Sequence, residues 1–136
     1  MNPLHNYALE FEIPIQAVAK ERARTFIDRR TGRMNSRTPP KTRGFEFAVR
    51  AYALQHRPKV PLDCPIRVHC EFQIQRPTRP KHALPATRPD LDNYVKALLD
   101  GLNGVVFKDD NCICELVAKK TYAETYPRIL VKVEAM

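Results

Sequence analysis

Hydrophobic and polar residues alternate in several segments of the chain, and this period of two is the pattern of strands with one buried face. The pattern is clearest over residues 65–74. It recurs over residues 7–13, where the apolar positions are Tyr7, Leu9, Phe11 and Ile13. Two closing strands are expected over residues 112–122 and 128–136. Residues 25–36 contain a turn at Thr-Gly between two short extended segments, which predicts a hairpin.

Apolar residues spaced three and four apart predict two helices. The first covers residues 41–57, which contain no proline. The second covers residues 92–103, and Gly101 and Gly104 are expected to end it. Before it, residues 75–89 hold four prolines, so we expect a long surface loop there.

This order of elements predicts an α+β protein, in which two helices pack on a mixed sheet as a two-layer sandwich. A chain of 136 residues suits a single domain, over residues 1–136, with one hydrophobic core. Hydrophobic residues make up 43% of the chain, which is enough for such a core.

Positive charge is concentrated in the first half of the chain, within a formal net charge of +8. Residues 20–59 contain twelve Lys or Arg against three acidic residues. Such a segment attracts polyanions, chiefly nucleic acid, through phosphate contacts and counterion release. The alternative interpretation is an ordinary soluble surface with a positive bias.

Several classes of protein do not fit the sequence. No apolar run approaches the roughly 20 residues that span a bilayer. The first residues lack the basic start and apolar stretch of a secretory signal, so we expect a cytoplasmic location and no membrane partner. The four cysteines form no C-x-x-C pair and have no histidine at zinc-finger spacing, so we expect buried core thiols rather than a zinc site. They are Cys64, Cys70, Cys112 and Cys114.

Acidic residues gather at the start of the second predicted helix, where Asp90 and Asp92 stand two apart. If residues 90–92 are extended, both carboxylates point to the same side. Lys96 then lies one helical turn beyond Asp92 on the same face. Two carboxylates held this close repel each other unless a cation joins them, and hard oxygen ligands suit Mg²⁺ or Mn²⁺. A third ligand would come from Asp109 or Asp110; because adjacent strand residues face opposite ways, at most one of the two is expected to join.

The same residues also have a purely structural interpretation. Asp90 or Asp92 can cap the helix, and Asp92 with Lys96 can form an ordinary i,i+4 ion pair. The Asp109-Asp110-Asn111 sequence is compatible with plain turn chemistry. The spacing by itself does not decide between a cation site and solvated surface.

Residues 88–113, "RPDLDNYVKALLDGLNGVVFKDDNCI", resemble the RusA family of Holliday junction resolvases, notably its phage-type members. The family pattern is D-x-D-N-x-x-K, then Asp-Ala/Gly-Leu, then D-D-x-Q-V/I. The matching residues are Asp90, Asp92, Asn93, Lys96, Asp100, Gly101, Leu102, Asp109, Asp110 and Ile113. The basic stretch over residues 17–47 is similar to that family's K-x-R-x-R and T-P-x-K-T segments. Cys112 replaces the family's frequent glutamine, which affects what surrounds Asp110.

The resemblance implies a homodimeric, magnesium-dependent endonuclease that cuts four-way DNA junctions, with Mn²⁺ able to replace Mg²⁺ and with no small-molecule substrate. It assigns metal binding to Asp90, Asp92 and Asp110, and catalysis to these three and Lys96. Asn93, Asp100 and Asp109 become supporting residues. Candidates for the surface that follows the DNA phosphates are Arg22, Arg24, Arg29, Arg30, Arg33 and Lys41.

Two other functions remain open at this point. One is a metal nuclease that acts on flaps or other branched DNA. The other is a non-catalytic RNA- or DNA-binding module, which would bind nucleic acid without Mg²⁺-dependent cutting.

Overall fold

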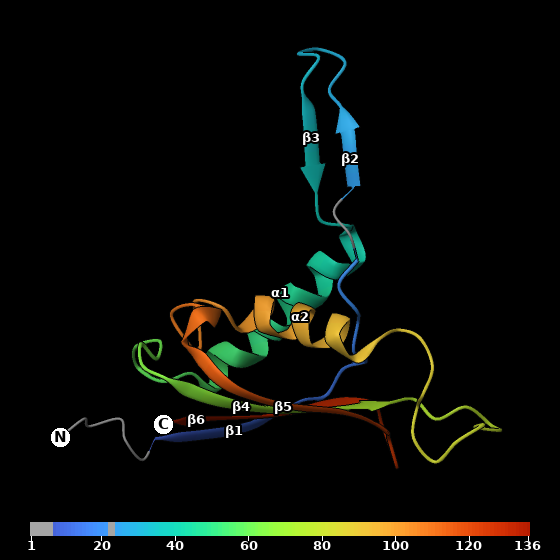
Figure 1. The fold of residues 1–136 in the computed structure, drawn as a ribbon, viewed down its shortest axis with the longest axis vertical. Helices are drawn as coiled ribbons and strands as arrows, with labels where there is room; N and C mark the ends of the chain where they lie inside the picture. Colours follow the sequence, from blue (N-terminus) through green and yellow to red (C-terminus); the bar gives the residue numbers. More distant parts are fainter. Residues whose placement is uncertain (1–6, 22–23) are drawn as a thin grey trace.

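The computed structural model describes residues 7–21 and 24–136, and its elements follow the predicted order (Figure 1). The regular elements are β1 (Ala8–Ile13), β2 (Arg24–Ile27), β3 (Met34–Arg37), α1 (Pro40–His56), β4 (Ile66–Ile74), α2 (Leu91–Leu102), β5 (Ile113–Tyr122) and β6 (Arg128–Ala135). A short 3₁₀ helix, η1 (Asp110–Cys112), precedes β5. Each predicted helix and strand is therefore present, with ends that differ by one or two residues.

Four strands form one mixed sheet in the order β1-β6-β4-β5. β4 and β5 are parallel, and the chain between them contains α2; the other two pairs are antiparallel. Figure 1 shows both helices over the same face of this sheet. The predicted α+β fold, with two helices on a mixed sheet, is confirmed.

The core lies between the sheet and the helices, and strand register builds it. Val131 of β6 pairs with Phe11 of β1 on one side and with Cys70 of β4 on the other, and all three side chains are buried. Because side chains alternate along a strand, the residues two positions away from each also face the helices. The segment Val105–Phe107 after α2 is buried as well. The apolar alternation in the sequence is thus the inner face of the sheet.

Gly101 has a different role from the predicted one. It lies inside α2, which continues to Leu102, so it does not end the helix. A Cβ atom built on Gly101 would lie 2.7 Å from Cγ1 of Val49 in α1. The absent side chain therefore allows the two helices to pack closely. Gly104, just after the helix, has a φ of 80°, a conformation that favours glycine.

The cysteines agree with the prediction only in part. All four are free thiols, and Cys70 is buried in the core. Burial raises the pKa of the Cys70 thiol to about 12. The prediction is wrong for Cys114, which is exposed, and Cys112 lies in η1 rather than in a strand with Cys114.

β2 and β3 form a separate two-stranded sheet that projects from the rest of the molecule (Figure 1). This confirms the predicted hairpin. We call residues 24–37 the arm.

No helix in the described part of the chain is both long and apolar enough to cross a membrane.

Candidate active site

α2 presents one apolar face and one polar face, as its sequence requires. Its buried side points at the core, and the opposite stripe carries Asp92, Lys96 and Asp100, each one turn apart. The buried residues of α2 are Tyr94, Val95, Ala97, Leu98, Leu99, Gly101 and Leu102. Packing of that side fixes the direction in which the polar stripe faces.

A chain of ion pairs ties the polar stripe to α1. Lys96 Nζ lies 3.1 Å from Oδ1 of Asp100, and Lys20 Nζ lies 3.1 Å from Oδ2 of the same carboxylate. Lys20 also contacts Oε1 of Glu46, in α1, at 2.7 Å. Burial opposes the charged form of Lys20, but hydrogen bonds to Glu46 and Asp100 raise its pKa above the ordinary value. Asp100 is therefore shared by two ammonium groups and holds Lys96 against the helix.

Asp90 and Asp92 both lie at the N-terminal end of α2, but not in the extended geometry considered from the sequence. Asp90 is extended, with φ −71° and ψ 148°, and its carbonyl accepts the N–H groups of Asn93 and Tyr94. Asp92 already belongs to the first helical turn. Neither carboxylate caps the helix through its side chain, and no ion pair within the described residues joins Asp92 to Lys96. The helix dipole favours negative charge at both positions.

The loop end that carries Asp90 is tied to the sheet. Lys120 of β5 donates hydrogen bonds from Nζ to the carbonyl of Thr87 at 2.9 Å and to that of Pro89 at 3.0 Å. β5 therefore holds the segment just before Asp90 against the body of the protein.

Asp110 lies close enough to α2 for its charge to act on the polar stripe. Its pKa is raised above the ordinary value, first by hydrogen bonding with the neighbouring Asp109 carboxyl, then by burial and by the charge of Asp109. Lys96 lowers it and Asp100 raises it further. The sequence predicts that Asp109 and Asp110 open a strand and therefore face opposite ways. This prediction is wrong, because Asp110 opens η1 and β5 begins only at Ile113.

The donors around α2 suit a hard divalent cation. They are carboxylate oxygens, the ligands that such cations prefer. Among the described residues, however, no three His, Cys, Asp or Glu side chains are gathered closely enough to hold a metal ion. The chain thus contributes two pairs of carboxylates. Asp90 and Asp92 lie at the start of α2, and Asp109 and Asp110 lie in the segment before β5. Their convergence on one ion stays a prediction.

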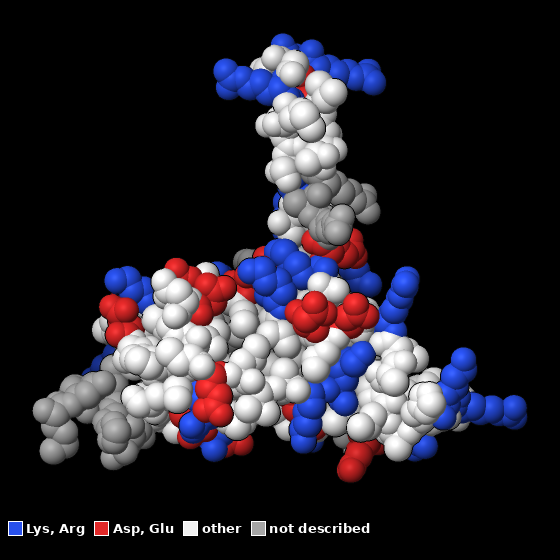
Figure 2. Space-filling view, in the orientation of Figure 1, with Lys and Arg blue, Asp and Glu red and all other residues white. Residues whose placement is uncertain are grey.

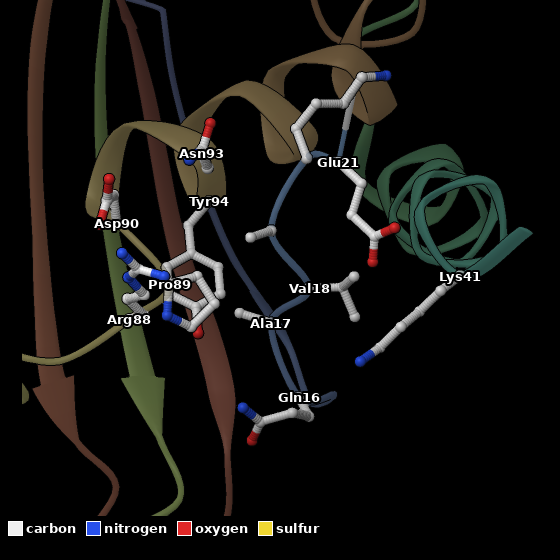
Figure 3. Close-up of a pocket in the computed structure, with 12 residues that line it drawn as sticks. Gln16, Ala17, Val18, Glu21, Lys41, Arg88, Pro89, Asp90, Asn93 and Tyr94 are labelled. Carbon is white, nitrogen blue, oxygen red and sulfur yellow. The ribbon is translucent and has the colours of Figure 1, made fainter. Parts of the chain in front are cut away.

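A groove of about 650 Å³ opens beside Asp90 (Figure 3). Figure 3 shows the Arg88 and Lys41 side chains on opposite sides of it, with Val18 between them. Its lining residues are Gln16, Ala17, Val18, Ala19, Lys20, Glu21, Lys41, Arg88, Pro89, Asp90, Asn93 and Tyr94. The groove therefore combines an apolar floor with two cations at its sides, next to a predicted metal ligand.

The predicted DNA-binding residues divide between two places. Arg29, Arg30 and Arg33 lie in the turn at the tip of the arm. In Figure 2 the tip carries blue side chains, whereas the stem of the arm is white. Lys41 is far from the tip in the fold, in the first turn of α1 and in the groove. Arg22 lies outside the described residues, and Arg24 begins β2.

Two residues that the sequence did not single out belong to this region. Lys20 binds Asp100 across 80 residues of chain, and no local spacing could indicate that contact. Arg88 belongs to the proline-rich loop over residues 75–89, and it lines the groove beside Asp90. Its position immediately before the Pro-Asp pair was the available signal.

Comparison with known proteins identifies the family of the chain. Residues 14–134 match the family model described as Endodeoxyribonuclease RusA. The chain is also 32% identical over 140 residues to "Uncharacterized protein YqaN" from Bacillus subtilis (strain 168), covering 92% of this chain and 94% of that protein. Because the family match spans nearly all the described elements, the chain belongs to the RusA endodeoxyribonuclease family, whose members are nucleases that act on branched DNA.

Proposed function

We propose that this protein is a Mg²⁺-dependent endonuclease that resolves four-way DNA junctions, working as a homodimer that makes paired cuts. The observation that supports it best is the arrangement along α2. Asp92, Lys96 and Asp100 stand one turn apart on α2, and the charge of Lys96 acts on Asp110 from a separate part of the chain.

Asp90, Asp92 and Asp110 would hold the metal ion, with Asp109 next to it. When bound, a divalent cation polarises a phosphoryl oxygen and lowers the pKa of a bound water, and Mn²⁺ can serve in the same way. The carboxylates of the chain position the cation and offset its charge. Asp90 and Asp92 would contribute from the start of α2, and Asp110 from the turn that leads into β5.

Lys96 would stabilise negative charge that develops on the phosphate during cleavage. Its side chain is 56% exposed and its ammonium is held by Asp100 at 3.1 Å, so it can contact a DNA phosphate without leaving the helix surface. Asp100 acts by positioning Lys96. Asn93, whose carbonyl accepts the Lys20 N–H at 2.9 Å, helps hold the neighbouring segment against α2.

The groove beside Asp90 would receive the DNA strand next to the cut. Lys41 and Arg88 are suited to bind successive phosphates, and the apolar floor at Val18 accommodates a sugar or base. In this arrangement the scissile phosphate lies at the Asp90 end of the groove.

Two matched cuts require two sites, and each chain supplies one set of candidate residues. A four-way junction has approximate two-fold symmetry, so an isologous dimer would present two sites related by the same symmetry as the substrate.

The test uses purified protein with a synthetic mobile junction, in Mg²⁺ or in EDTA, with the products mapped. We expect symmetric nicks in Mg²⁺ alone. A plasmid with an extruded cruciform then tests pairing, because two cuts within one encounter release linear DNA and independent cuts release nicked circles. Equal cutting of flaps and junctions would favour the general branched-DNA nuclease, and binding without cutting would favour the non-catalytic module.

A further inference from the structure

The arm has one face that nothing else in the described structure covers. β2 and β3 pair only with each other, and their register sets Ile27 opposite Met34 and Thr25 opposite Ser36. Because side chains alternate along strands, these four residues share one face of the hairpin. Figure 1 shows the arm standing clear of the sheet and helices, so this face is not part of the core.

The end of this face nearest the tip is apolar and open to solvent. Ile27 is 65% exposed and Met34 is 72% exposed, and the two are direct cross-strand neighbours. A two-stranded hairpin without further packing is marginally stable in water. An exposed apolar pair on such a hairpin therefore points to a surface that is covered by a binding partner.

The opposite face of the arm is already partly occupied. The guanidinium of Arg37 lies 4.8 Å from the centre of the Phe26 ring, which is the geometry of a cation–π contact. Phe26 is consequently less exposed than Ile27 and Met34. The apolar pair, rather than the aromatic ring, is the side of the arm left without a partner.

The tip of the arm carries the charge that identifies the partner. Asp28 closes the turn, since its backbone N–H donates to the Arg33 carbonyl at 2.8 Å and its Oδ1 accepts the Arg30 N–H at 2.9 Å. Within the described residues, the side chains of Arg29, Arg30 and Arg33 form no ion pair. Figure 2 shows Lys and Arg side chains directed outward at the tip of the arm. Three free guanidinium groups beside an apolar pair complement a ligand with phosphates next to apolar faces, which describes DNA.

We propose that the arm is a wedge that enters the branch point of the DNA substrate. Ile27 and Met34 pack against the base faces exposed where strands exchange, and the tip arginines bind the phosphates on either side. Isoleucine and methionine are among the apolar side chains that proteins insert between base steps. In linear duplex the insertion must first unstack a base pair, whereas bases at a branch open at lower cost. The arm would thereby favour branched over linear DNA; this inference rests on the proposed function.

The experiment compares wild-type protein with the Ile27→Ser/Met34→Ser variant, both as full chains in EDTA so that no cutting occurs. The probe is a four-way junction with 2-aminopurine beside the branch point, and a linear duplex of the same sequence is the reference. We expect wild-type protein to raise the junction fluorescence about twofold or more, because unstacking relieves quenching. The double variant should give no rise at saturating concentration and should bind the junction about tenfold more weakly.

Two further variants serve as controls. Met34→Leu keeps an apolar wedge and should retain the rise. Val60→Ser removes a side chain that is 73% exposed in the segment between α1 and β4, and should behave as wild type. Far-UV circular dichroism and melting temperature should be unchanged in all variants, because the substituted side chains are exposed.

A double variant that still raises the fluorescence as wild type does would overturn the wedge. A double variant that sediments as a monomer while wild type is a dimer would also overturn it, and would assign the face to a second copy of the chain. Wild-type protein that cuts junctions in Mg²⁺ but never changes the fluorescence would reject the wedge alone. Wild-type protein that neither binds nor cuts junctions would reject the proposed function as well.

Discussion

The two regions assigned to DNA, the surface of α2 and the arm, are held in opposite ways. α2 is fixed by a buried side and by the Lys96–Asp100–Lys20 ion pairs, which reach α1 through Glu46. Among the described residues, the arm is held by its own strand pairing, the Arg37–Phe26 contact and the hydrogen bonds of its turn. Metal binding and proton chemistry need side chains held within a fraction of an ångström, so they belong on a packed helix. Phosphate contacts and insertion tolerate movement, so they can lie on a projecting hairpin.

The comparison predicts that changes on α2 affect cutting and changes on the arm affect binding. The largest effect is expected for Asp92→Asn, which removes a predicted metal ligand. Loss of a residue that only supports a metal ligand lowers activity about 10–100-fold. Loss of the ligand itself should lower the cleavage rate by more than this. Junction binding should stay the same or strengthen, because a negative charge near phosphates is removed.

Single-turnover cleavage and gel-shift titration measure these two quantities for Asp92→Asn. The matched control is Asp63→Asn, an exposed carboxylate paired with Lys108 at 3.5 Å and outside the α2 surface. Retained cutting by Asp92→Asn would count heavily against the metal site.

The second prediction concerns the packing that holds α2. Gly101→Ala places a Cβ 2.7 Å from Cγ1 of Val49 and 3.2 Å from the carbonyl oxygen of Glu46. We expect a loss of about 1–3 kcal/mol in the free energy of unfolding, as for other overpacked sites. Gly44→Ala, in α1, meets nothing within 4 Å and should instead gain about 0.5–1 kcal/mol from helix propensity.

Urea denaturation followed by circular dichroism measures both glycine variants. If Gly101→Ala were as stable as wild type, α2 would not depend on its close approach to α1. The contrast between a rigid α2 and a lightly held arm would then lose its basis.

A smaller effect is expected at the tip of the arm, for Arg30→Gln. Loss of one phosphate contact should weaken junction binding a few-fold and reduce the slope of log K against log salt by about 0.9. Cleavage at saturating protein should be unchanged, since the arm carries no predicted catalytic residue. Arg57→Gln, at the C-terminal end of α1, is the control. Fluorescence anisotropy at several salt concentrations gives the slopes, and identical slopes for Arg30→Gln and wild type would remove the tip from the DNA interface.

The smallest effect is electrostatic and tests whether Asp110 lies with Lys96. Asp109→Asn should lower the pKa of the Asp110 carboxyl, because it removes the group that raises this pKa most, and Lys96→Ala should raise it further. A carboxyl group whose pKa is higher in the folded than in the unfolded protein stabilises the fold at pH values below its unfolded-state pKa. This stabilisation is lost as the pH rises through its folded-state pKa. Asp109→Asn should therefore raise the melting temperature slightly at neutral pH but not in acid.

Carboxyl ¹³C NMR titration without divalent ions measures the Asp110 pKa directly. A Lys96→Ala variant with an unchanged Asp110 titration would separate the late aspartate from the α2 stripe. The proposed active site would then lack its third ligand in the single chain.

How far the sequence could predict the fold is clearest from individual residues. The alternation of Ile66, Val68, Cys70 and Phe72 identified β4, because a period of two has only one regular structure that buries it. The prediction that Gly101 ends the helix was wrong. A glycine near a helix end is compatible both with termination and with close packing of two helices. The sequence left open whether Asp92 is extended or helical, because local preference fixes the first residue of a helix only to within one or two positions.

The sequence by itself determined the elements, the mixed α+β class and the spacing of the acidic residues and lysine along α2, since all of these follow from local periodicity. Tertiary structure decided which distant groups meet. It placed Asp110 within the field of Lys96, brought Lys20 to Asp100 and Glu46, joined Arg88 and Lys41 across one groove, and left Ile27 and Met34 uncovered on the arm. Such contacts depend on how the packed faces orient each element, and no local pattern along the chain contains that information.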